Sequence, residues 1–122
     1  MDLSNIQAGQ KAEQVVSITK DMTTNRTGKE GADVLSTPAL LGLMEDTSIK
    51  ATDHRLPKGF TTVGFAVDGL RHIAPTAIGG RVTVRSELTG VDKNKLTYSI
   101  EAYEGDKKIS VASHRRAIIP SG

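Results

Sequence analysis

The chain has 122 residues, of which 37% are hydrophobic, so we expect one modest core and a single domain over residues 1–122. It contains no cysteine, which excludes a disulfide framework, thiol chemistry and cysteine-ligated zinc. A net charge of +2 and only two Phe and two Tyr argue against a nucleic-acid partner. Because no apolar run approaches the length of a membrane span and the N-terminus does not read as a signal peptide, we expect a cytoplasmic protein without membrane contact.

The first half of the chain predicts a strand, a loop and a helix. β-Branched residues at 13–19 favour a strand, and the polar, aperiodic stretch 23–33 is typical of a long loop. Ser36-Thr37-Pro38 then offers an N-cap hydroxyl followed by proline, a pattern that starts helices. We therefore predict a helix over residues 38–51.

The second half of the chain predicts only strands. Val63, Phe65 and Val67 share one parity in the stretch 61–72, which is followed by breakers and by three further strands with short turns. We predict these strands at 81–90, 96–103 and 108–119, so that four strands form a meander. One helix beside such a sheet favours an α+β fold in which a curved antiparallel sheet wraps around the helix, and the exposed sheet edge predicts a homodimer.

Two adjacent acidic residues on the predicted helix have different surroundings. Glu45 falls on the stripe of Leu41 and Ile49, whereas Asp46 falls between Gly42 and Lys50, the pattern of a solvent-facing surface. Glu45 is therefore either a carboxylate at the edge of the core or a carboxylate of restricted solvation that is suited to act as a base.

Three histidines are available as partners for such an acid. The polar neighbours of His54 and the two arginines after His114 favour solvated side chains. His72 ends the long strand just before Pro75 and Gly79, where a bulge or bend could aim its ring, so structural and functional interpretations both stay open. Asp68 lies four residues before His72, and on a regular strand the two would share a face, as in the acid/base dyad of a hydratase.

Thr37 also has two interpretations. As a hydroxyl before proline it is an N-cap, and this is a structural role. A helix N-terminus is nevertheless a donor site for a carbonyl oxygen. Because Thr37 and Glu45 are about 12 Å apart along a helix axis, one ligand lying along the helix could contact both.

Several segments together resemble a known family. They are Val34-Leu-Ser-Thr-Pro-Ala-Leu-Leu-Gly-Leu-Met-Glu-Asp46, Thr62-Val-Gly64, His72-Ile-Ala-Pro-Thr-Ala-Ile-Gly79, Glu87-Leu-Thr-Gly-Val-Asp92 and Ser113-His-Arg-Arg116. Over residues 11–119 the chain is similar to the fluoroacetyl-CoA thioesterase-like branch of the hotdog-fold thioesterases. The most specific parts are GLME on the helix and H-x-A-P-T-x-x-G after the strand.

The resemblance implies a hotdog fold, a homodimer or dimer of dimers with sites at the subunit interface, and hydrolysis of an acyl-CoA without a cofactor or metal. It assigns catalysis to Thr37, Glu45 and His72, and substrate binding to Gly64 and Phe65. Glu45 would either attack the thioester or activate water, and His72 would orient Glu45 or protonate the leaving thiolate.

Two departures from the family pattern qualify these implications. Residues 64–72 form a stretch one residue longer than the family pattern, and Gly69 offers a place for a bulge. Residues 23–33 contain no aromatic side chain that could match the family's aromatic lid, so the fluoroacetyl substrate is not transferred to this chain.

Two other functions remain open from the sequence. A hotdog module that binds acyl-CoA without turnover would have the same shape but would not need Glu45. A buried acid costs stability unless it is used or satisfied, which favours the enzyme. The other alternative is an enoyl-CoA hydratase that uses Asp68 and His72.

Overall fold

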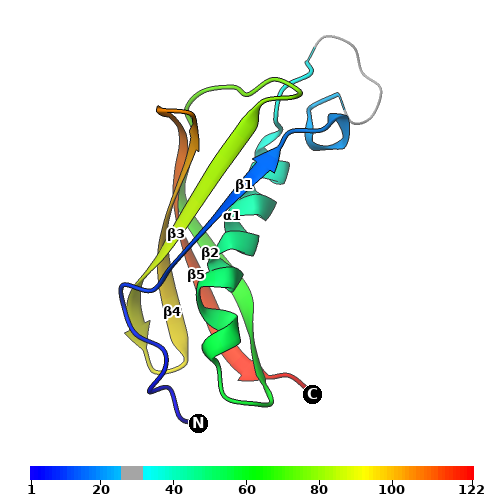
Figure 1. Cartoon of the computed structure of the whole chain (residues 1–122). Coiled ribbons are helices and arrows are strands. Elements are labelled where there is room, and N and C mark those ends of the chain that lie inside the picture. Colours follow the sequence, from blue (N-terminus) through cyan, green and yellow to red (C-terminus); the bar gives the residue numbers. More distant parts are fainter. Residues whose placement is uncertain (26–31) are drawn as a thin grey trace.

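The computed structural model describes residues 1–25 and 32–122 and consists of one long helix packed on one antiparallel sheet (Figure 1). The strands are β1 (Lys11–Ser17), β2 (Phe60–His72), β3 (Arg81–Asp92), β4 (Lys95–Glu104) and β5 (Lys107–Pro120). Helix α1 spans Thr37–Thr52, and two short 3₁₀ helices, η1 (Lys20–Met22) and η2 (Asp53–Arg55), precede and follow it. The expected α+β arrangement is confirmed. No helix in the described ranges is long and apolar enough to cross a bilayer.

The strand order is β1-β3-β4-β5-β2, with antiparallel pairing throughout. The predicted meander is correct for β3, β4 and β5 and wrong for β2, which pairs with β5 at the far edge. The reason lies in residues 73–80, which connect β2 to β3 across the sheet and separate the two strands. The predicted boundaries differ by at most two residues: β1 lies two residues earlier than expected, and β3 ends two residues later.

The core lies between α1 and one face of the sheet. Side chains of β3, β4 and β5 alternate between buried and less buried positions, and the buried set packs with Leu40 and Met44 of the helix. Helix α1 packs mainly on β3 and β1 and touches β2 only slightly. The strip of sheet formed by β5 and β2 is therefore less covered by the helix.

Polar side chains fix the helix on the sheet. In the second half of α1 the buried residues are mostly hydroxyl-bearing, so polar as well as apolar side chains of the helix pack on the sheet. Ser48 Oγ lies 2.8 Å from Ser86 Oγ of β3, and Thr52 Oγ1 lies 2.6 Å from the Tyr98 hydroxyl of β4. These directional contacts set the position of the helix along the strands.

Strand β2 is irregular at two points. Its register against β5 shifts between Gly64 and Ala66 and again between Asp68 and Arg71. Gly69 has a φ of 61°, a left-handed conformation that glycine adopts without strain, so the bulge anticipated there is confirmed. The first shift separates Val63, which pairs with Ala117, from Val67, which pairs with His114. The expectation of one shared parity for this strand was therefore wrong.

Candidate functional site

The start of α1 presents Thr37 to solvent. Ser36, and not Thr37, caps the helix, because the Ser36 hydroxyl accepts a hydrogen bond of 3.2 Å from the Ala39 backbone N–H. Thr37 occupies the first helical position, and its Oγ1 lies 2.9 Å from Nδ1 of His72. The capping interpretation of Thr37 was therefore wrong, and its side chain is free to act at the histidine.

His72 stands at the end of β2, beside a groove. Burial lowers the pKa of its imidazole, so the ring is neutral at neutral pH. The groove has a volume of about 300 Å³, and its lining is formed by Thr24, Val34, Leu35, Thr37, His72, Ile73, Ala74 and Pro75. Since a helix N-terminus carries a partial positive charge, this groove suits a carbonyl oxygen or another electron-rich atom.

Glu45 is partly buried and Asp46 is exposed, as their helical positions predicted. Glu45 makes no hydrogen bond or ion pair to another described residue, His72 and Thr37 included. Its negative charge instead acts on His114, whose pKa it raises against the larger effect of burial. Within one chain, the structure therefore brings Thr37 and His72 together and places Glu45 near a different histidine.

His114 is the residue that the sequence interpretation missed. It was expected to be solvated, but its side chain is 1% exposed, because β5 turns even-numbered residues toward the helix. Its Nδ1–H donates to the Ala66 carbonyl at 2.8 Å, and its Nε2 accepts from Arg116 Nη1 at 3.1 Å. The alternation Ser113-His-Arg-Arg116 on a strand was the available signal, because positions 114 and 116 share a face. His54 is exposed, as expected.

Arg116 is itself buried and held by a chain of hydrogen bonds. Its Nε donates to Thr62 Oγ1 at 2.8 Å and its Nη2 donates to the Thr62 carbonyl at 3.0 Å. Thr62 Oγ1 in turn donates to both carboxylate oxygens of Asp53, each at 2.9 Å. The end of α1 is thereby connected through β2 to the histidine on β5.

Gly64 lies directly against this cluster. A Cβ at Gly64 would lie 2.8 Å from His114 Cε1 and 3.1 Å from Arg116 Nη1, too close for a side chain.

Phe65, by contrast, contacts Lys95 and Arg115, with ring-to-cation distances of 5.8 and 5.2 Å. Arg115 alternates with His114 on β5, so the Phe65 ring lies on the outer face of the sheet. The two residues expected to bind substrate thus lie on opposite faces of the sheet within one chain.

The hydratase dyad is not formed. Asp68 pairs with Ser113 and His72 pairs with Ser110, and these two partners have opposite parity on β5. The bulge at Gly69 therefore turns Asp68 to the outer face and His72 to the helix face. The prediction that they share a face was wrong.

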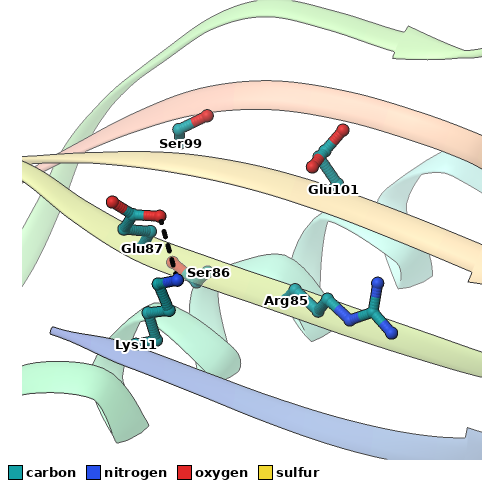
Figure 2. Close-up of a pocket in the computed structure, with 6 residues that line it drawn as sticks. All are labelled: Lys11, Arg85, Ser86, Glu87, Ser99 and Glu101. Atoms are coloured by element: carbon teal, nitrogen blue, oxygen red, sulfur yellow. Dashed lines mark ion pairs between the residues drawn. The ribbon is translucent and has the colours of Figure 1, made fainter. Parts of the chain in front are cut away.

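A second hollow, of about 180 Å³, lies over β1, β3 and β4 (Figure 2). Its lining residues are Lys11, Arg85, Ser86, Glu87, Ser99 and Glu101. Its charged groups are already paired: Lys11 Nζ lies 3.8 Å from Glu87 Oε1, and Arg85 Nε lies 2.9 Å from Glu13 Oε2. In the described parts of the chain, no three potential metal-binding side chains gather at one point.

Comparison with known proteins shows which family the chain resembles. A family model described as fluoroacetyl-CoA-specific thioesterase matches residues 18–122. A fluoroacetyl-CoA thioesterase from Streptantibioticus cattleyicolor is 33% identical over 90 residues, which are 74% of this chain and 64% of that protein. The chain thus spans just under two thirds of the length of this relative.

Solved structures agree with this match. A hot-dog-like protein from Thermanaerovibrio acidaminovorans has a TM-score of 0.89 at 25% identity, over 99% of this chain and 90% of its own. A mutant of the fluoroacetyl-CoA-specific thioesterase, in complex with fluoroacetate and CoA, has a TM-score of 0.84 at 26% identity, over 95% and 97% of the two chains. The expected hotdog fold is confirmed, and the chain belongs to the family of fluoroacetyl-CoA-specific thioesterases.

Proposed function

We propose that this protein hydrolyses the thioester bond of an acyl-CoA to a free acid and CoA. The observation that carries the proposal is the contact of 2.9 Å between Thr37 Oγ1 and His72 Nδ1 beside the groove at the start of α1. Family membership supports the reaction class, and the relative in complex with fluoroacetate and CoA supports CoA thioesters as the substrate class. The absence of aromatic residues from 23–33 argues against a fluoroacetyl preference; positions 26–31 lie outside the described residues.

In the proposed reaction, the thioester carbonyl lies near the helix N-terminus. The partial positive charge of the helix N-terminus stabilises the negative charge that develops on the carbonyl oxygen. Because Glu45 lies about two helical turns from Thr37 in one chain, the Glu45 that acts on this carbonyl comes from the second copy of the proposed dimer. It either removes a proton from the attacking water or attacks the carbonyl to form an anhydride, which water then opens. The C–O bond to water forms and the C–S bond breaks. The proton that the water gives up passes to the departing thiolate by way of His72, which first takes up a proton and then releases one.

The proposed active protein is a homodimer or a dimer of dimers. Strand β2 is an edge strand of the sheet, and it carries both Gly64 and His72. Val63 and Phe65 on this strand are exposed apolar side chains. Pairing of β2 with the same strand of a second copy would extend the sheet and cover these side chains. Each site would then lie at the subunit interface.

A thiol-release assay against short, branched and aromatic acyl-CoAs tests the proposal. We expect hydrolysis of at least one class at a rate well above the background rate in buffer. Binding of acyl-CoAs without thiol release by the active-site-intact protein would instead identify a module that binds without turnover. Hydration of an enoyl-CoA without thiol release would contradict the thioesterase assignment.

A further inference from the structure

Ser110 of β5 is a buried hydroxyl that the proposed reaction does not use. Its side chain is 0% exposed, and its Oγ has no hydrogen-bond partner among the described residues. Nε2 of His72, the ring nitrogen that does not face Thr37, is likewise buried and without a partner in the same part of the chain. Buried polar atoms are almost always hydrogen-bonded, so each of these two atoms requires an explanation.

The sheet register places these two residues opposite each other. His72 of β2 pairs directly with Ser110 of β5, and directly opposed side chains point to the same face of a sheet. The next residue, Ile73, donates its backbone N–H to the Ile109 carbonyl at 2.7 Å. His72 and Ser110 are therefore a non-hydrogen-bonded pair, the type in which opposed side chains approach most closely, with Cα atoms about 4.5 Å apart.

We propose that Ser110 is a positioning residue that accepts a hydrogen bond from Nε2–H of His72. The serine hydroxyl would reach Nε2 by rotating about its Cα–Cβ bond, or through one bridging water between the two atoms. It satisfies both buried atoms at once and holds the ring in the Nε2–H tautomer. This inference rests on the proposed function only for its effect on catalysis, because the tautomer is a property of the unliganded protein.

The tautomer decides what Thr37 can do. When Nε2 carries the proton, Nδ1 is an acceptor, and Thr37 donates its only hydroxyl proton to it across the 2.9 Å contact. When His72 gains a second proton at Nδ1, the direction of this hydrogen bond reverses and the Thr37 hydroxyl proton turns toward the groove. Protonation of His72 thus makes Thr37 a donor to a substrate oxygen.

No charge of the described residues adds to the effect of burial on the pKa of His72. Burial alone lowers the pKa of His72, and no charged side chain of the described residues contributes to the shift. Removing the Ser110 hydroxyl takes an acceptor from the imidazolium form, so the pKa of His72 should fall further. A substitution at Ser110 should therefore be detectable as a change in the pKa of the His72 imidazole.

The test compares Ser110→Ala with Ser113→Ala, a control on the same strand whose side chain faces the other side of the sheet. Imidazole ¹⁵N NMR of the unliganded protein should show the Nε2–H tautomer of His72 in the parent and in Ser113→Ala, and a mixture of tautomers in Ser110→Ala. With an acyl-CoA substrate, Ser110→Ala should lower kcat about tenfold with little change in KM, the effect of losing one orienting hydrogen bond.

Several outcomes would overturn the inference. An Nδ1–H tautomer in the parent protein would do so without any variant, and so would a Ser110→Ala protein whose His72 signals and kcat match the parent. If Ser110→Ala does not fold, Ser110→Gly provides the same readout. Absence of thioesterase activity in the parent together with the expected NMR change would refute the proposed function and leave the Ser110–His72 contact standing.

Discussion

At the scale of single residues, two histidines with lowered pKa values lie on the helix face of neighbouring strands. Burial is the largest cause in both cases. His72 contacts Thr37 at the groove, whereas His114 is enclosed between Ala66 and Arg116. The first is open to a substrate, and the second is a fixed neutral ring next to the charge of Glu45.

The two adjacent acids of α1 provide a matched pair for kinetics. We expect Glu45→Gln to lower acyl-CoA turnover by at least about a hundredfold, the scale of a lost general base or nucleophile. Asp46→Asn should stay within a few fold of the parent, because its side chain is exposed on the other side of the helix. Steady-state thiol release measures both. Equal losses in the two variants would show that Glu45 has no special role.

The buried His114 should make stability depend on pH. Because its pKa is lowered in the folded state, the unfolded chain takes up a proton nearer the ordinary value of 6.5. The stability that the neutral ring contributes is therefore complete above this pH and declines as the pH falls below it. We expect the decrease in Tm between about pH 7.5 and about pH 5 to be smaller in His114→Gln than in the parent.

The control for this pH effect is His54→Gln, since His54 is exposed. Its Tm should change with pH as the parent does. Thermal denaturation by circular dichroism measures all three proteins. If Tm falls as much in His114→Gln as in the parent, His114 does not contribute to the pH dependence of stability.

At the scale of elements, hydroxyl contacts join α1 to the sheet where its buried face becomes polar. Tyr98 of β4 is 0% exposed, and burial raises its pKa to about 12, so its hydroxyl stays protonated. The partner of this hydroxyl is Thr52 on the last turn of the helix.

Removing one hydroxyl of the Thr52–Tyr98 pair should lower the free energy of unfolding more than removing both hydroxyls. Thr52→Val leaves the Tyr98 hydroxyl buried and unsatisfied, so we expect it to lower the free energy of unfolding by about 1–3 kcal/mol. Adding Tyr98→Phe should recover part of this loss. Urea denaturation of the single and double variants measures the coupling. Strictly additive losses would mean that the 2.6 Å contact contributes nothing.

The bulge in β2 lies between Asp68 and His72. Because they face opposite sides of the sheet, we expect Asp68→Asn to keep full thioester cleavage and His72→Ala to impair it. No hydration of an enoyl-CoA should be detectable in either variant. Loss of cleavage in Asp68→Asn, together with hydration by the parent, would transfer the chemistry to the strand.

At the scale of the whole molecule, the helix covers the sheet unevenly. It packs mainly on β3 and β1 and barely contacts β2, the edge strand that carries His72. The exposed apolar side chains Val63 and Phe65 lie on the same strand, with 42% and 47% of their surface accessible. A second copy is the partner that would complete this edge.

We expect light scattering at micromolar concentration to give at least twice the chain mass of 13.0 kDa. Val63→Lys on β2 should shift the population toward monomer, because it places a charge at the proposed interface. Val15→Lys is the control, since Val15 is 51% exposed on β1, the opposite edge of the sheet. A 13.0 kDa species alone would remove the interface site from the proposed mechanism.

The sequence by itself determined the elements and the family. Periodicity, the Ser-Thr-Pro start and the turn residues are local signals, so they predicted one helix, five strands and boundaries within two residues. The GLME and H-x-A-P-T segments are also local, and they were enough to identify the thioesterase family, which the comparisons confirmed.

Only the tertiary structure decided which residues meet. The pairing of β2 with β5 depends on a crossover that no local pattern encodes, and it alone brings Gly64 against His114 and Arg116. The bulge at Gly69 reverses the parity of β2, so a single extra residue decides that His72, and not Asp68, faces the helix. Side-chain period in a strand is exact, and a shift of one residue therefore changes every later contact.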